Sequence, residues 1–477
     1  MSHSAAFRSS RLPYAGLPVP NSRITSPRPE AKLKKVIAMH AEVRNALRTA
    51  VQNVSALLQP VADRPTEPCL VWRRAGQRSW QSEYMQRPSF ISLEPEIVAT
   101  ITAAGRNFLD AFLKHHPEYS GTVGTTLMTM NITHDPGRIP KLVAATLWER
   151  HGSLQPEASQ LETVLDEFAE FIDKPTIRII AIAPLLNFYM EPGSLPLFEN
   201  VTLRRLTEDE ISALHGGPLW HRPFVSHHGT LEEFTLEGEF DVEKVFGNPT
   251  GGEPTGFAAL RDKFSQAVRG LRTFKTGRVG FEYIHLRTPT FCPFIFGSHG
   301  SADLYIPFGR YDIAENEIEL LRQHVTYMFA KLDSALETAC SRLADAETRL
   351  RPVDAILDAA IGLEALLLAE MNTEARRGEL RFRFACHYST FFDKPNERHE
   401  AFILARDIYD LRSAIAHGSP IDQKPELAGK RVELPEAAKC ACEVLRKSVK
   451  RFLPEGSKPE YRSKGYWTKG LFGLPRD

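Results

Sequence analysis

An arginine and a histidine stand five residues apart in the stretch ARDIYDLRSAIAHGSP. The guanidinium of Arg412 presents a planar fork of donors that suits phosphate oxygens. The imidazole of His417 belongs to a residue type that can accept or donate a proton. This pair could therefore cleave RNA without a metal ion, with His417 moving a proton and Arg412 stabilising charge on the phosphorus in the transition state.

The sequence around this pair predicts a helix with one apolar face. Its apolar residues recur at intervals of three and four, at Phe402, Ala405, Ile408, Leu411 and Ile415. Gly418 and Pro420 then end the helix. Because each residue turns an ideal helix by 100°, Arg412 and His417 lie about 140° apart around it. Both can reach one substrate only if the last turn loosens, the arginine reaches round, or a second subunit contributes.

The segment YDLRSAIAHG resembles the closing motif of the HEPN superfamily, in its Apea-like branch. That motif is an arginine, four to six residues and a histidine, and Ser413 occupies the polar position that follows the arginine. Upstream, IGLEALLL resembles the glutamate-containing helix of the branch, with Glu364 as its polar residue. ELRFRFACHYSTFF resembles its arginine-bearing helix, although His387 stands where a second arginine is expected.

The resemblance covers roughly residues 315 to 455 and implies a helical bundle that forms a homodimer. It implies a catalytic group of Arg412, Ser413 and His417, with Glu364 and Arg383 in contact with the RNA. The protein would then be a metal-independent endoribonuclease, acting in phage defence or in a stress response. The alternative is a HEPN module without catalysis, which dimerises or binds nucleotide or RNA.

The pair also allows roles that involve no chemistry. Arg412 can form a structural ion pair with Asp407, Asp410 or Glu364. His417 can cap the carbonyl groups at the end of its helix, as histidines near helix C-termini do. The sequence leaves these roles open beside the catalytic one.

The segment RKSVKRFLPEGSKPEYRSKGYWTKG is basic and rich in aromatic residues. It carries eight lysines and arginines against two glutamates, a net charge of +6. Such a segment can bind RNA by charge and base stacking, so Lys464 and Trp467 are candidate RNA contacts. Alternatively, its aromatic residues dock on the parent domain.

A chain of 477 residues suggests more than one domain. Residues 1–30 predict a disordered tail, and 31–310 mix helical and strand-like segments in an α+β domain, or in two subdomains with a break near residue 175. Residues 311–455 predict five consecutive helices with no strands, as in an antiparallel bundle, and 456–477 form the basic aromatic tail. The predicted fold class is α+β, with a mixed N-terminal region followed by an all-α bundle.

Composition narrows the function further. Lysine plus arginine and aspartate plus glutamate both number 59, so the chain has no net charge. This neutrality argues against a protein that binds nucleic acid over its whole surface. The six cysteines lack zinc-site spacing and indicate free thiols in a reducing compartment. No apolar run approaches the ~20 residues that span a bilayer, so we expect a cytoplasmic protein without a membrane partner.

Two histidine pairs, His115–His116 and His227–His228, have no matching cluster of acids or cysteines in the sequence. We interpret them as surface residues. The sequence therefore predicts no metal site and no cofactor.

Overall fold

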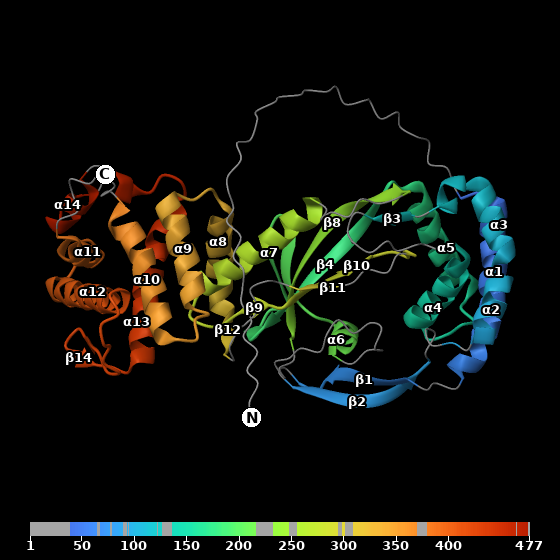
Figure 1. The fold of residues 1–477 in the computed structure, drawn as a ribbon, viewed down its shortest axis with the longest axis horizontal. Coiled ribbons are helices and arrows are strands. Elements are labelled where there is room, and N and C mark those ends of the chain that lie inside the picture. Colours follow the sequence, from blue (N-terminus) through green and yellow to red (C-terminus); the bar gives the residue numbers. More distant parts are fainter. Residues whose placement is uncertain are drawn as a thin grey trace, which may run out of the picture. The chain divides into compact units, whose positions relative to one another are not determined.

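The computed structural model describes residues 39–63, 67–76, 79–88, 93, 95–121, 123–125, 136–215, 232–247, 255–293, 298–300, 309–369, 379–463 and 465–475. The tail predicted over residues 1–30 lies outside this part of the chain. The described residues confirm the α+β class, with a sheet-containing region followed by a helical one (Figure 1).

The first five helices pack together around α1. Their bounds are α1 (Ala41–Ala62), α2 (Pro95–Ala104), α3 (Arg106–His115), α4 (Ile139–His151) and α5 (Ala158–Asp173). Helix α1 contacts each of the other four. It does so because Val43, Leu47, Val54 and Leu58 recur on one face and are fully buried.

The main sheet is built on two long antiparallel strands, β4 (Thr176–Leu186) and β8 (Phe234–Phe246), which lie side by side in Figure 1. Its strand order is β11-β10-β4-β8-β7-β6, with β3 also paired to β8 and β9 to β4. The shorter strands are β3 (Val123–Thr125), β6 (Ser194–Phe198), β7 (Val201–Arg205), β9 (Gly280–Phe281), β10 (Tyr283–Arg287) and β11 (Ser298–Gly300). The helices that follow β7 and β8 are α6 (Glu208–His215) and α7 (Thr255–Phe274).

A separate hairpin pairs β1 (Glu67–Arg74) with β2 (Trp80–Arg87). Seven of the eight residues of β2 are exposed. A strand with so little burial shows no alternation of apolar and polar residues, so the sequence gives little sign of β2.

The prediction that no strand follows Arg310 is wrong. Strand β12 (Tyr311–Ile313) pairs in parallel with β5 (Phe188–Met190), and a small hairpin joins β13 (Glu426–Leu427) to β14 (Lys430–Arg431). These strands are two or three residues long, too short to produce a period of two in the sequence.

The other elements of this region are helices, as predicted up to residue 455, whereas α14 lies in the segment predicted only as a basic aromatic tail. They are α8 (Ile318–Phe329), α9 (Ser334–Ala346), α10 (Pro352–Leu367), α11 (Leu380–Ser389), α12 (Pro395–Ala416), α13 (Leu434–Phe452) and α14 (Tyr466–Leu471). The first predicted helix of the bundle is two helices, α8 and α9, because the Asp333 side chain starts a new one by accepting the Ala335 N–H (3.0 Å).

Two large apolar clusters form the core, and they divide within α8. Leu321 and Val325 belong to the cluster that includes the main sheet, whereas Met328 belongs to the cluster of the bundle. Helices α10 and α13 approach closely at Gly362, where an added Cβ would lie 2.7 Å from Leu445 Cδ2. None of the described helices combines the length and apolar character needed to cross a membrane.

Candidate functional site

Helix α12 keeps its helical geometry up to His417. The Gly418 N–H donates to the Ile415 carbonyl (3.1 Å), and the Ser419 N–H donates to the Ala414 carbonyl (2.9 Å). With Gly418 at φ +68°, these two bonds close a Schellman motif. The last turn is therefore closed, so loosening of the helix is not what brings His417 towards Arg412.

The His417 side chain is exposed at this helix end. The backbone N–H groups of Gly418 and Ser419 satisfy carbonyls of the last turn, and the His417 N–H itself donates to the Ser413 carbonyl (3.0 Å). Within the described part of the chain, the imidazole has no hydrogen-bond or ionic partner. It does not cap the helix and is available to solvent.

Arg412 makes an ion pair with Glu364 across the packed helices α12 and α10. Arg412 Nη2 lies 3.1 Å from Glu364 Oε2, and the two side chains are 27% and 23% exposed. The Arg412 Nε is buried and has no partner among the described residues. Burial raises the pKa of the Glu364 carboxyl, although the charge of Arg412 and its hydrogen bond oppose this shift.

The other two acids that the sequence offers to Arg412 are engaged elsewhere. Asp410 pairs with Arg381. Asp407 accepts from Arg406 (3.0 Å) and from the Ala428 N–H (2.9 Å), which ties the hairpin after α12 to the helix. Of the three partners left open by the sequence, Glu364 is the one that Arg412 contacts.

The candidate residues thus lie on three helices of one bundle. Glu364 on α10 and Arg412 on α12 are in direct contact, and Ser413 and His417 follow on α12. Arg383 is half-buried on α11, which packs against α12. In the described residues, no hydrogen bond or ion pair joins the side chains of Arg412 and His417.

The position where a second arginine is expected is occupied by a buried histidine. His387 is 4% exposed, and its Nδ1 lies 2.6 Å from the Leu367 carbonyl oxygen. Burial lowers the pKa of His387 to about 4, against the opposing effect of that hydrogen bond. His387 is therefore neutral at pH 7 and serves the packing of the bundle.

The aromatic residues of the basic segment dock on the bundle. Tyr461, Tyr466 and Trp467 are at most 3% exposed. The Trp467 ring stacks on His387 with centroids 4.5 Å apart. Trp467 is therefore no platform for a nucleic-acid base, because its ring is already covered, and the docking interpretation is the one that the geometry supports. Lys464 lies outside the described residues.

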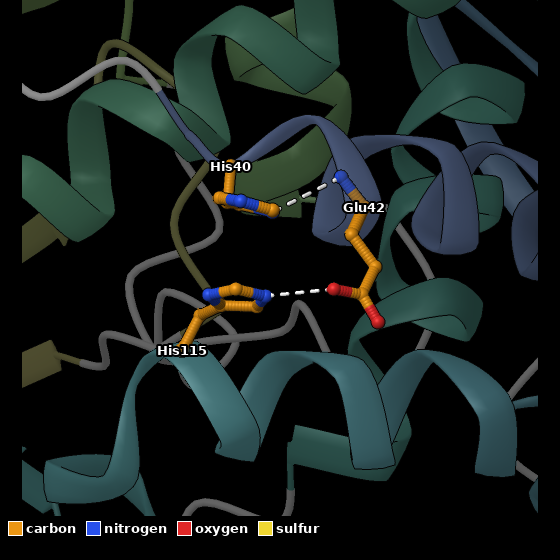
Figure 2. Close-up of side chains that lie close together, drawn as sticks. All are labelled: His40, Glu42 and His115. Carbon is orange, nitrogen blue, oxygen red and sulfur yellow. Dashed lines mark hydrogen bonds and ion pairs between the residues drawn. The ribbon is translucent and has the colours of Figure 1, made fainter.

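The first histidine pair, which we expected at the surface, is half-buried. His115 Nε2 lies 2.9 Å from Glu42 Oε2, and His40 stacks on the His115 ring (Figure 2). Its neighbour His116 is half-buried and lies near Glu118. His227 and His228 lie outside the described residues.

Models of protein families, curated proteins and solved structures were each compared with the chain, and none of the three comparisons found a match.

Proposed function

We propose that the C-terminal bundle is a HEPN-type endoribonuclease that cleaves RNA without a metal ion. The observation that carries this proposal is the exposed His417, which has no side-chain partner among the described residues and stands five residues after Arg412, whose hydrogen bond goes to Glu364. An arginine has five N–H donors, so Arg412 keeps donors for a phosphate.

In the proposed reaction, neutral His417 takes the proton of a ribose 2′-hydroxyl. The 2′-oxygen then attacks the adjacent phosphorus, and the bond from phosphorus to the 5′-oxygen breaks. The 5′-oxygen leaves with a proton from an acid, and the products are a 2′,3′-cyclic phosphate and a 5′-hydroxyl. Arg412 stabilises the charge on the phosphorane-like transition state.

A single His417 cannot act as base and acid in the same step. It also lies on a different side of α12 from Arg412, about 140° away around the helix axis. A homodimer through the bundle would bring a second His417 to the same cleft as the acid. Glu364 would orient Arg412, and Ser413 and Arg383 would contact the RNA backbone. We place this activity in the cytoplasm, in phage defence or a stress response.

The test is cleavage of labelled tRNA and mixed cellular RNA by the purified chain in EDTA. We expect cleavage, and His417→Ala should slow it by about 10²–10⁴-fold, the usual contribution of a proton-transfer group. Arg412→Ala should lower the rate of cleavage by about 10²–10³-fold. The matched control is His399→Ala, which removes an exposed histidine from the same helix. Absence of cleavage, or equal rates for His417→Ala and the wild type, would refute the proposal.

The second candidate is a HEPN module without catalysis that dimerises or binds nucleotide or RNA. The Arg412–Glu364 ion pair favours it, because this pair gives Arg412 a structural role. It predicts that His417→Ala leaves RNA affinity and dimer mass unchanged. A charge at Phe382, which is 56% exposed on α11, would then disrupt the dimer, as measured by light scattering.

A further inference from the structure

The first turn of α1 and the last turn of α3 bring three potential metal ligands together. His40 caps α1, with its Nδ1 accepting the Glu42 N–H (3.3 Å), and His115 is the last residue of α3. One ligand atom from each of His40, Glu42 and His115 lies within 4.8 Å of the others. Figure 2 shows the two stacked rings with the Glu42 carboxylate beside them.

We propose that His40, Glu42 and His115 bind a divalent transition-metal ion of the zinc type. Two imidazole nitrogens and one carboxylate oxygen are ligands that Zn²⁺ favours, and they leave a fourth position for water. The proposed cleavage of RNA involves residues of the bundle and no metal, so this site is independent of it.

The pair His115 and Glu42 already has suitable spacing. Their atoms Nε2 and Oε2 lie 2.9 Å apart, close to the ~3–3.5 Å between neighbouring ligand atoms that metal–ligand distances of ~2 Å imply. His40 must move, because its ring stacks on His115 at 3.8 Å and 18°, and parallel rings cannot both direct a lone pair at one ion. The His40 side chain is exposed and has room to rotate.

The carboxylate at this cluster already attracts a cation. Lys114 Nζ lies 3.0 and 2.9 Å from the two Glu42 oxygens. A metal ion would displace the Lys114 ammonium, which is 64% exposed and can move into water.

Removing Lys114 therefore distinguishes a metal site from a cluster that is held together only by hydrogen bonds and ion pairs. If the cluster exists only as an ion pair, removing Lys114 weakens it. If the cluster binds metal, removing Lys114 takes away a competing positive charge, and the metal should bind more tightly. A bound ion would also tie the start of α1 to the end of α3 and stabilise the packing of these helices.

The experiment titrates the metal-free full chain with Zn²⁺ by calorimetry and follows the thermal midpoint in parallel. We expect one ion per chain with a raised midpoint. His40→Ala and His115→Ala should each weaken binding by about tenfold or more. Lys114→Ala should tighten it, and the control His151→Ala, at an exposed histidine of α4, should leave it unchanged. Circular dichroism checks that each variant is folded.

Equal Zn²⁺ affinity in the wild type and in a His40→Ala/His115→Ala double variant would overturn the proposal, because the ion would then bind elsewhere. Failure of the wild type to bind one equivalent would also overturn it. The double variant should cleave RNA in EDTA at the wild-type rate. Loss of metal binding and loss of ribonuclease activity are therefore separate outcomes.

Discussion

Two arginine–glutamate pairs of the helical region show how burial changes the role of the same two residue types. Arg446 on α13 pairs with Glu347, which caps α9, and the two side chains are 4% and 6% exposed. Arg412 on α12 pairs with Glu364 on α10, and these side chains are 27% and 23% exposed.

The buried pair is surrounded by further partners. Arg446 also donates to Glu443 and to Thr276 Oγ1 (2.9 Å), while Glu347 accepts the Gly277 N–H (3.2 Å). These bonds hold the segment after α7 against α9 and α13. Among the described residues, one hydrogen bond joins Arg412 to Glu364. A buried pair with several further partners serves packing, whereas a half-exposed pair with one hydrogen bond can exchange its partner for a ligand.

The strongest test of this comparison is Arg446→Ala. It leaves Glu347 buried without its counter-charge, so we expect a loss of about 3–5 kcal/mol in the free energy of unfolding. Urea unfolding followed by circular dichroism measures it. The control Lys447→Ala, at an exposed neighbour on α13, should change stability by less than about 0.5 kcal/mol.

A loss below about 1 kcal/mol in Arg446→Ala would remove the distinction between the two pairs. Replacing both partners, as in Arg446→Met/Glu347→Leu, should restore most of the lost stability, because no buried charge then remains. If the double variant is as unstable as Arg446→Ala, lost packing rather than an unpaired charge is the cause.

A smaller loss of stability is expected when the pH is lowered, because His324, which lies beside the same buried network, is held neutral in the folded protein. Its Nε2 is 2.8 Å from Thr273 Oγ1. Burial, with the charges of Lys450 and Arg446, lowers the pKa of His324 to about 3. The unfolded chain binds this proton near pH 6.5, so the contribution of neutral His324 is complete above that pH and falls as pH drops towards 3.

Between pH 6.5 and 5 this loss amounts to about 2 kcal/mol. Urea unfolding at pH 7 and pH 5 measures it in the wild type and in His324→Gln. The variant should lose less stability on acidification. His387 titrates in both proteins, so the difference reports His324 alone, and equal losses would show that His324 is not held neutral by burial.

The smallest expected effect is that of Arg412→Ala on stability. A half-exposed pair with one bond of 3.1 Å contributes about 1 kcal/mol or less. Arg412 opposes the raised pKa of Glu364, so its removal raises that pKa further. The difference in the free energy of unfolding between the wild type and the variant should therefore be largest at pH 7 and shrink towards pH 4. Urea unfolding at both pH values measures it.

Arg351→Ala, which breaks an exposed pair with Asp354 at the start of α10, is the control for Arg412→Ala and should show no comparable change with pH. A loss above about 3 kcal/mol at Arg412 would make the two pairs equivalent. Arg412 would then be a structural residue, in agreement with the second candidate function.

Local patterns in the sequence predict most helices and their ends. Thr207 and Glu210 have the spacing of a capping box, and the Glu210 N–H does donate to Thr207 Oγ1 (3.1 Å) at the start of α6. Gly418 marks the end of α12, where the structure has a positive φ. Such features depend on residues within one or two turns, so sequence spacing is sufficient to find them.

Features that depend on distant residues could not be predicted. Strand β12 pairs with β5, more than a hundred residues earlier, and His115 meets Glu42 across 73 positions. The sequence offers Arg412 three acids, and the packing of α10 against α12 selects Glu364. The role of Trp467 was equally undecided, because a basic aromatic segment looks the same whether its rings face water or a core.

Asp333 has a consequence for the order of folding. This cap of α9 also accepts from the Tyr461 hydroxyl (2.7 Å) and from Arg462 (3.0 Å), at separations of 128 and 129 residues. Closing so long a loop costs entropy before any contact compensates for it. The segment after α13 is therefore expected to dock late, on helices that have already assembled. Mutations there should accelerate unfolding and leave the refolding rate nearly unchanged.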